Sequence, residues 1–196
     1  MLRKAIALLL IAASPGAFAL NLVTNPDFDH DLSGWTVGGG AYRESFFGSP
    51  VGGTLRMDGS SNDVVEVATQ CVDVHRWPKI DFALRYFVNA QYGSGTHVFS
   101  LDIYDAADCA GNKLTPISPI SPNEGAAVSI SEGIPDSGWL EAGAYDVALP
   151  PGSTSALITL GIASGTAANP GGASYMMDHI QVGPLEEIFK DDFEPN

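Results

Sequence analysis

Hydrophobic and polar residues alternate with a period of two along most of this chain. Such alternation is typical of β-strands with one buried face, and Gly, Pro, Asn or Ser interrupts it about every ten residues. The 22 glycines and 13 prolines supply many turns and leave no room for long helices. The pattern predicts strands at residues 54–57, 64–74, 80–89, 97–105, 139–149, 155–163 and 174–182. We therefore expect an all-β fold, an antiparallel β-sandwich.

Two consecutive predicted strands show the alternation most clearly. Their apolar sides, which we expect in the core, consist of Ile80, Phe82, Leu84, Tyr86 and Val88, followed by Phe99, Leu101 and Ile103. Their opposite sides carry Arg85, Phe87 and Asn89 on the first strand, and Asp102 and Tyr104 on the second. Because a ring and a guanidinium stand together on a polar side, we single this second set out as a candidate site.

The regions at the two ends of the fold and one long internal segment complete the prediction. Residues 21–37 predict a first strand, a turn at Asn25-Pro26 and a loop leading to a buried Trp35. The last strand, residues 174–182, places Tyr175, Met177 and His179 on one side and Met176, Asp178 and Ile180 on the other. Residues 114–135 contain four prolines and little periodicity, which predicts a long surface excursion.

The chain begins like an exported protein. Arg3 and Lys4 precede an apolar run, and a small-x-small site ends at Ala19, which is the pattern of a signal peptide over residues 1–19. No later run approaches the roughly 20 apolar residues of a membrane span. We expect secretion to the periplasm or the extracellular space, one β-sandwich domain over residues 20–183, and an exposed acidic tail over residues 184–196.

The chain is strongly acidic. It carries 9 Lys and Arg against 23 Asp and Glu, a net charge of −14, and loss of the two basic residues of the signal peptide would take this to −16. Such a surface repels nucleic acid and anionic lipid and disfavours anionic polysaccharides. Neutral partners are therefore favoured.

Two cysteines, Cys71 and Cys109, lie in a chain marked for an oxidising compartment. Pairing into a disulfide is the economical interpretation, and two unpaired buried thiols are the alternative. Two residues are too few for a zinc site.

Several short phrases occur in an order typical of one superfamily. They are Asn-Pro-Asp-Phe-Asp then Gly-Trp in residues 25–35, Leu-Arg-Met at 55–57, Thr-Gln-x-Val at 69–72, Tyr86-Phe87, Gly138-Trp139, and Tyr-x-x-Asp-x-Ile at 175–180. Over about residues 21–182 the chain resembles secreted bacterial carbohydrate-binding modules of the galactose-binding-like β-sandwich superfamily. The resemblance implies a jelly-roll sandwich with Trp35 and Trp139 in the core. The tail phrase IFKDDFEP resembles endings of secreted proteins of xanthomonad-type bacteria, which implies a bacterial origin.

The resemblance also implies a structural calcium ion. In such modules an acid of the N-terminal phrase and an acid of the last strand bind the ion, and the matching residues here are Asp29 and Asp178. Asp27 and the backbone near Thr54 are expected to complete a shell of six to eight oxygens. The alternative is that Asp29 caps a turn and Asp178 accepts backbone hydrogen bonds.

Modules of this kind bind sugars on an aromatic platform with hydrogen-bonding side chains on one sheet face. By resemblance, the ligand-binding residues are Arg85, Phe87, Asn89, Asp102 and Tyr104, with Tyr42 and Trp77 as loop alternatives. The expected partner is a neutral polysaccharide or cell-surface glycan.

An enzyme is not expected. The sequence has no Gly-x-Ser-x-Gly, His-Glu-x-x-His or Cys-x-x-Cys motif, and its four histidines are dispersed. We therefore expect a non-catalytic carbohydrate-binding protein. The alternatives are a structural or adhesive sandwich that binds protein without a sugar site and, more distantly, a hydrolase, because the many carboxylates allow acid pairs.

Overall fold

A computed structural model describes residues 20–38, 40–45, 52–58, 65–89, 95–117, 129–130, 139–164 and 174–184. The expected signal peptide and nearly all of the acidic tail lie outside these ranges. The elements in chain order are β1 (Thr36–Val37), β2 (Tyr42–Glu44), β3 (Thr54–Asp58), β4 (Val65–Asp73), β5 (Lys79–Asn89), β6 (Gly95–Tyr104), the 3-10 turn η2 (Ala107–Cys109), β7 (Lys113–Ile117), β8 (Ser129–Ile130), β9 (Leu140–Ala148), β10 (Ser155–Ser164) and β11 (Ser174–Gly183). The predicted strands and the all-β class are confirmed. No helix in the described ranges is long and apolar enough to cross a membrane.

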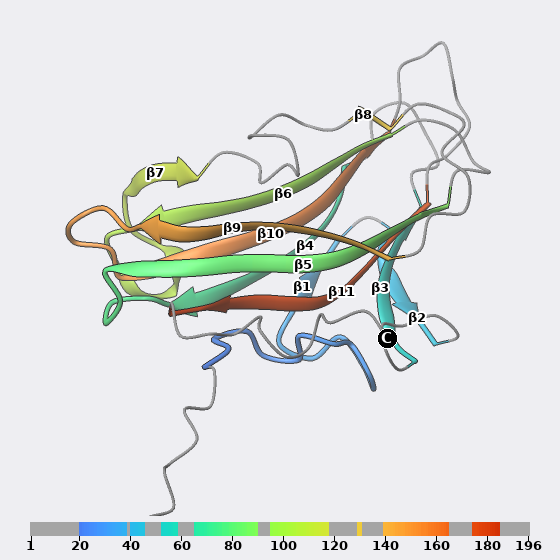
Figure 1. Cartoon of the computed structure of the whole chain (residues 1–196), viewed down its shortest axis with the longest axis horizontal. Helices are drawn as coiled ribbons and strands as arrows, with labels where there is room; N and C mark the ends of the chain where they lie inside the picture. The colour runs from blue at the N-terminus through green and yellow to red at the C-terminus, as the bar shows by residue number, and fades with distance from the viewer. Residues whose placement is uncertain are drawn as a thin grey trace, which may run out of the picture.

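The strands form two antiparallel sheets packed face to face (Figure 1). Sheet A has the order β1-β4-β10-β6-β7, with β8 pairing to β6, and sheet B has the order β2-β3-β11-β5-β9. Consecutive strands β5 and β6 belong to different sheets, and so do β9 and β10. The chain therefore crosses repeatedly between the layers, as in a jelly roll.

One apolar core lies between the sheets. The predicted inward residues of β5 from Ile80 to Tyr86 and those of β6 are buried, among them Phe82 at 1% exposure and Phe99 at 0%, and they join inward residues of β3, β4, β10 and β11. Trp35 is buried as predicted and packs at 5.4 Å from the ring of Phe28. Alternation alone thus identified the sides of the strands that meet in the core. The exact domain boundaries at residues 20 and 183 stay a prediction.

The alternation predicted for the last strand is interrupted by a β-bulge. The pairing of β11 with β5 shifts between Asp178 and Gln181, and His179 has a left-handed φ of 53°. Tyr175 and Met177 point into the core as expected, but the next inward residue is Ile180. The prediction that His179 shares the side of Tyr175 is therefore wrong, because the extra residue of the bulge turns it to the outer side.

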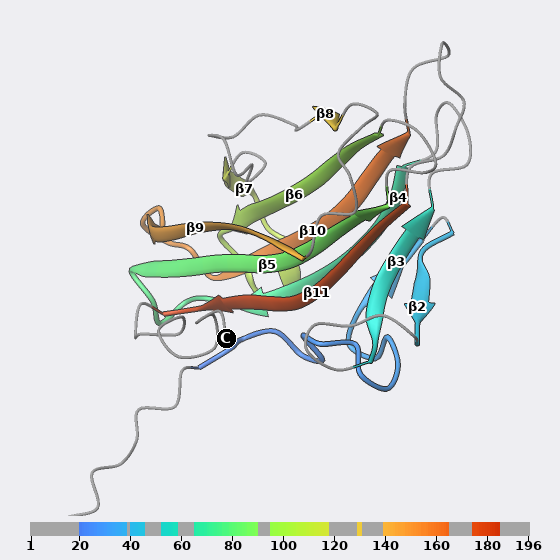
Figure 2. The same cartoon turned by 45° about the vertical axis from the view of Figure 1, so that its right-hand side comes forward.

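The N-terminal segment, residues 20–33, is not the predicted first strand. It runs as irregular chain beside the second half of β11, where β3 no longer pairs (Figure 2). Leu22 donates a backbone hydrogen bond to Val182, and Ile180 donates one to Pro26. The turn at Asn25-Pro26 is confirmed.

The same segment also reaches sheet A. The backbone N–H of Thr24 donates to Oε1 of Gln70 at 2.7 Å, and Nε2 of Gln70 donates back to the carbonyl of Thr24 at 2.9 Å. Gln70 is only 6% exposed and points inward from β4. This reciprocal pair ties the segment to sheet A, while Leu22 and Pro26 tie it to sheet B, so one side of the sandwich is closed.

Part of the predicted excursion at residues 114–135 is regular. β7 and β8 lie within it or at its start, and both pair with β6. The segment predicted as a surface excursion therefore contains short paired strands at these positions. Residues 118–128 and 131–138 lie outside the described ranges.

Cys71 and Cys109 form the predicted disulfide, with their Cα atoms 6.0 Å apart. It joins the outer side of β4 to η2. The Ser155 hydroxyl also holds η2 in place, because it accepts the N–H of Cys109 and donates to the carbonyl of Ala106. The bond spans 38 residues of sequence, so it removes considerable freedom from the unfolded chain.

We predict that replacing both Cys71 and Cys109 by Ser lowers the free energy of unfolding by roughly 4 kcal/mol, the value expected for a loop of this length, and lowers Tm by roughly 10 °C. Thermal melting by circular dichroism measures this change. The wild type under reducing conditions is the control and should melt with the double variant. Equal melting of oxidised wild type and variant would contradict the stabilising role.

Candidate functional site

The five residues predicted to bind a ligand on one sheet face do not lie on one face. Arg85, Phe87 and Asn89 belong to β5 in sheet B, whereas Asp102 and Tyr104 belong to β6 in sheet A. The outer faces of the two sheets point away from each other, since both inner faces meet in the core. The single group was expected because the two strands are consecutive, and that expectation is wrong because the chain crosses between sheets after β5. Whether any of these residues binds a ligand is not tested by this arrangement.

On the outer face of sheet A, the two predicted residues are engaged in local contacts. Oδ1 of Asp102 lies 2.7 Å from Nζ of Lys113 on the neighbouring strand β7. Tyr104 is half-buried at the end of β6. Asp102 thus serves an ion pair between strands, and this face offers no described cluster of rings.

The outer face of sheet B carries a row of side chains across four strands. In the pairing registers, Tyr42 of β2 faces Arg56 of β3, Arg56 faces Met176 of β11, and Met176 faces Phe87 of β5. Neighbouring strands are about 4.8 Å apart, so the row from Tyr42 to Phe87 spans about 14 Å. We call these four residues, together with Trp139, the outer row.

Trp139 extends the row beyond β5. Its ring lies 6.0 Å from that of Phe87 at an interplanar angle of 52°. Both rings are half-buried, and neither joins the core cluster. The prediction that Trp139 is a core residue is therefore wrong. The tilted pair provides an apolar surface at one end of the row.

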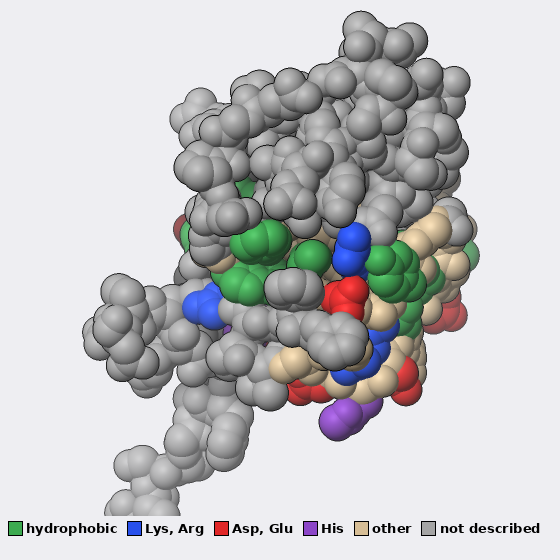
Figure 3. Space-filling view, turned by 90° about the vertical axis from the view of Figure 1, so that its right-hand side faces the viewer, with side chains coloured by type: hydrophobic (Ala, Val, Ile, Leu, Met, Phe, Trp, Pro, Cys, Tyr) green, Lys and Arg blue, Asp and Glu red, His purple; other side chains and the backbone are tan. Residues whose placement is uncertain are grey.

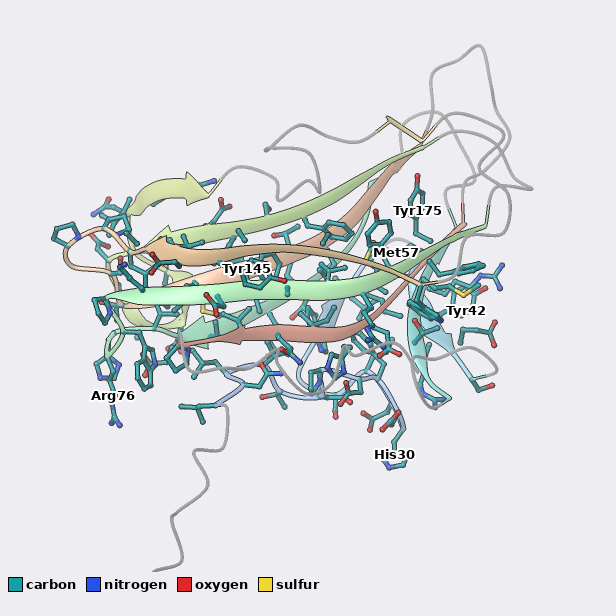
Figure 4. The ribbon with its side chains drawn as sticks, viewed as in Figure 1. His30, Tyr42, Met57, Arg76, Tyr145 and Tyr175 are labelled. Atoms are coloured by element: carbon teal, nitrogen blue, oxygen red, sulfur yellow. A yellow bond between two sulfur atoms is a disulfide. The ribbon has the colours of Figure 1, made fainter. Side chains whose placement is uncertain are left out.

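At the other end of the row, Tyr42 lies beside the charged side chains of Arg56 and Glu44. The guanidinium carbon of Arg56 lies 5.6 Å from the centroid of the Tyr42 ring, and Nη1 of Arg56 lies 3.3 Å from Oε2 of Glu44. Tyr42 is 39% exposed. Figure 4 shows Tyr42 at one end of the long axis of the sandwich, and Figure 3 looks onto this end, where hydrophobic side chains stand beside Arg or Lys and Asp or Glu side chains. The row thus combines rings with a positioned cation and anion.

Arg85, one of the predicted residues, stands next to the row. It faces Asp178 across the β5–β11 pairing and is half-buried. Its positive charge is close enough to His179 to affect the pKa of that imidazole. Asn89 is the last residue of β5, and its side chain lies outside the described part of the structure.

Sequence reasoning missed Arg56, Met176 and Trp139. They come from three distant parts of the chain. The insertion of β11 between β3 and β5 brings Arg56 and Met176 beside Phe87, and the pairing of β9 with the other edge of β5 brings Trp139 to it. Strand alternation does place Arg56 and Met176 opposite the inward Leu55, Met57, Tyr175 and Met177. The strand pairing was the missing information, and no local pattern supplies it.

Two of the three carboxylates expected to bind calcium, those of Asp27 and Asp178, have other partners. Oδ1 of Asp27 lies 2.9 Å from Nδ1 of His179, and Asp178, at 1% exposure, accepts the N–H of His179 at 2.8 Å. Asp29 is exposed. Among the described residues, no group of three or more His, Cys, Asp and Glu side chains is arranged to hold a metal ion.

The side chain of Arg43 donates hydrogen bonds to two backbone carbonyls at Asp29. Nε of Arg43 donates to the carbonyl of Phe28 at 2.6 Å, and Nη2 donates to the carbonyl of Asp29. The backbone of Phe28 and Asp29 can lie this close to β3 because residue 53 is glycine. A Cβ at this position would lie 2.5 Å from the Phe28 carbonyl oxygen. A cation is thus already supplied by the chain at this corner, and the residues present do not fit the expected calcium shell.

Calcium binding stays a prediction, and thermal melting tests it. If an ion binds near Asp29, added Ca²⁺ raises Tm in a concentration-dependent way and a chelator lowers it. Replacing Arg43 by Ala lowers Tm in either case, because the carbonyls of Phe28 and Asp29 lose a charged donor. An unchanged Tm of the wild type with Ca²⁺ and with chelator would contradict calcium binding.

The contact between Asp27 and His179 links the N-terminal segment to the bulge of β11. The hydrogen bond to Asp27 raises the pKa of His179 above its ordinary value, against the opposing effects of burial and of Arg85. On the other ring nitrogen, Nε2 lies 2.6 Å from Nε2 of Gln181, whose buried Oε1 has no partner among the described atoms. Rotating that amide brings Oε1 onto the imidazole, which suits a protonated His179.

The raised pKa gives a pH-dependent stability with a defined sign. The contribution of the pair is present in full below the unfolded pKa of about 6.5 and is lost as the pH rises through the raised pKa of the folded state. We predict that Asp27→Asn lowers Tm by a few degrees at about pH 5.5 and has little effect at about pH 9. The partial exposure of Asp27 limits the size of the change. An equal loss at both pH values would contradict the ion pair.

The fold is similar to solved carbohydrate-binding modules. The C-terminal family 22 carbohydrate-binding module of Clostridium thermocellum Xyn10B gives a TM-score of 0.56 at 12% identity, over 84% of this chain and 94% of the module. A module named TmCBM61, solved in complex with β-1,4-galactotriose, gives a TM-score of 0.51 at 13% identity, over 84% of this chain and 98% of the module. These likenesses confirm the antiparallel β-sandwich fold expected from the sequence.

The chain is also similar to part of a phage protein. The enzymatically active domain of tailspike protein 4 from bacteriophage CBA120 gives a TM-score of 0.55 at 18% identity, over 83% of this chain. Our chain spans only 21% of that protein chain, so the likeness concerns one part of it. At such identities the likenesses show the fold alone. No family model matches the sequence, and no curated protein matches it.

Proposed function

We propose that this protein is a secreted, non-catalytic carbohydrate-binding module that binds a neutral glycan along the outer row of sheet B. Phe87 and Trp139 form the apolar platform for a sugar ring. Arg56 and Arg85 donate hydrogen bonds to its hydroxyls, and Tyr42 flanks the chain at the far end of the row.

The observation that carries the proposal is the contact between Phe87 and Trp139 outside the core. The two rings are half-buried and 6.0 Å apart, and Phe87 lies in register with Met176, Arg56 and Tyr42. The CH face of a pyranose packs on such rings, while guanidinium groups address its hydroxyls. A row of about 14 Å across the strands suits an extended oligosaccharide better than a single small ligand.

The charge of the protein favours a neutral glycan. A net charge of −14 repels polyanions at long range. Within the row, the positive Arg56 is balanced by Glu44 at 3.3 Å, so the surface offers both donors and acceptors. Hydroxyl groups, which both donate and accept, match this arrangement.

The fold similarities support the proposal. The similar TmCBM61 was solved with β-1,4-galactotriose bound, and a family 22 domain with a TM-score of 0.53 is described as a xylan-binding domain. We transfer to our chain only the class of ligand, a neutral polysaccharide. The adhesive and hydrolase alternatives remain as outcomes of the experiment.

We predict that Phe87→Ala and Trp139→Ala each weaken binding of xylohexaose or β-1,4-galactotriose by about tenfold or more, since each removes half of the platform. Isothermal titration calorimetry measures the effect. Tyr104→Ala, on the outer face of sheet A, is the matched control and should bind like the wild type.

Four results would contradict the proposal. Unchanged affinity in both platform variants would exclude the outer row, and loss of binding in Tyr104→Ala would move the site to sheet A. Absence of binding to any neutral glycan would favour the adhesive alternative. Release of reducing sugars during the titration would favour the hydrolase alternative.

A further inference from the structure

A second aromatic side chain borders a groove at the opposite end of the sandwich. Trp77 lies in the turn between β4 and β5, next to Arg76, and Figure 4 shows Arg76 at the end of the long axis away from Tyr42. The turn between β9 and β10, residues 149–154, forms the other wall. This groove is therefore separate from the outer row.

Two hollows share Trp77 in their lining, and this partly buried side chain also packs against the core. The larger has a volume of about 460 Å³ and lies between the residues 75–78 and the Pro150-Pro151-Gly152 turn. The smaller, about 170 Å³, lies between Trp77 and the start of the N-terminal segment at Leu20 and Leu22. The larger volume falls in the usual range of ligand pockets. A polymeric ligand could thus cross the indole from one hollow to the other.

Backbone hydrogen bonds hold the two walls in place. The N–H of Val74 donates to the carbonyl of Thr154 at 3.0 Å. The N–H of Leu149 donates to the carbonyl of Pro78 at 2.9 Å. Each turn also has an internal backbone hydrogen bond. The N–H of Trp77 donates to the carbonyl of Val74, and the N–H of Ser153 donates to the carbonyl of Pro150. The groove is therefore formed before any ligand binds, which reduces the ordering cost of binding.

The polar groups at the groove form a chain with a defined proton arrangement. Nε of Arg76 donates to Nε2 of His75 at 3.3 Å, so Nε2 is the acceptor and the proton of a neutral imidazole sits on Nδ1. Nδ1 then donates to Oδ1 of Asp73 at 2.5 Å. With one guanidinium and one carboxylate, the groove has a local charge near zero and presents both donors and acceptors.

Arg76 differs from four other cations of the described part of the chain. Arg43 binds two carbonyls, while Arg56, Lys79 and Lys113 each bind a carboxylate. The Nη atoms of Arg76 have no hydrogen-bond partner among the described residues. Its terminal donors are therefore free to bind acceptors of a ligand in the groove.

From this geometry we propose that the Trp77 groove is a second glycan-binding site, which takes a neutral sugar residue. The ring of the sugar packs on the indole between the two hollows, and its hydroxyls bind Arg76 and Asp73. The proposal rests on the proposed function, because both sites are assigned the same class of ligand. With sites at opposite ends of the sandwich, one molecule joins two glycan chains, or two stretches of one chain, and gains affinity by multivalency.

The three tryptophans of the chain allow each site to be observed separately. Trp139 reports on the outer row, Trp77 reports on the groove, and the buried Trp35, whose Nε1 donates to the carbonyl of Asn25, is an internal control. In ¹H–¹⁵N NMR spectra the three indole signals are assigned with Trp77→Phe and Trp139→Phe. Xylohexaose and β-1,4-galactotriose are then titrated into the intact protein.

We expect the indole signals of Trp77 and Trp139 to shift with at least one of these sugars while that of Trp35 stays in place. Phe87→Ala should weaken the response of Trp139 and leave that of Trp77 unchanged. Arg76→Gln, at an exposed position, should weaken the response of Trp77 about tenfold and leave that of Trp139 unchanged.

The outcomes separate the two claims. A shift of Trp139 without a shift of Trp77 would overturn the second site and leave the outer row intact. A shift of Trp77 alone would support the groove and contradict the outer row. If neither signal moves with either sugar, both are overturned. A response of Trp77 that Arg76→Gln leaves unchanged would also overturn the groove as described.

Discussion

The insertion of β11 between β3 and β5 is the pairing on which the rest of the structure depends. It joins the last strand of the sandwich to strands from the first half of the chain, with registers that bring Met176 opposite both Arg56 and Phe87. The same strand continues past β3, and its free edge there is covered by the N-terminal segment through Leu22 and Pro26. Closure of the sandwich and assembly of the outer row therefore follow from one strand.

The bulge in β11 lets this strand serve two surfaces. Before it, Tyr175 and Met177 fill the core; after it, Ile180 and Val182 do so, with the shift absorbed at His179. The bulge turns His179 outward to Asp27, which anchors the N-terminal segment, while Gln70 anchors it to the other sheet. Arg43 is a further anchor of this segment, because it donates hydrogen bonds to the carbonyls of Phe28 and Asp29. Side chains of Asp27, Gln70 and Arg43 thus fix the N-terminal segment, and calcium binding near Asp29 stays a prediction.

Local patterns were sufficient for the strands and the core, because alternation depends only on which side of a strand meets the other sheet. Phe82, Phe99 and Leu101 were assigned correctly for that reason. The candidate site depends instead on which strands are neighbours. Asp102 and Tyr104 were grouped with Phe87 because their strands are consecutive, and the crossing between sheets separates them. Trp139 was placed in the core from a short phrase, although its contact with Phe87 lies outside it. The position of the bulge was likewise not encoded in the hydrophobic pattern of residues 174–182.

The central claim is that a glycan lies along the outer row, packed on Phe87 and Trp139. Labelling the methionine methyl groups with ¹³C tests it most directly. Met176 is 2% exposed but lies on the side of β11 that carries the row, next to Phe87 in the pairing register, whereas Met57 and Met177 belong to the core and serve as controls. The account predicts that xylohexaose or β-1,4-galactotriose shifts the methyl signal of Met176 and gives intermolecular contacts from sugar protons to Phe87 and Trp139, with Met57 and Met177 unmoved. Binding of either sugar that leaves the Met176 signal unchanged and shows no contact to these rings would contradict it.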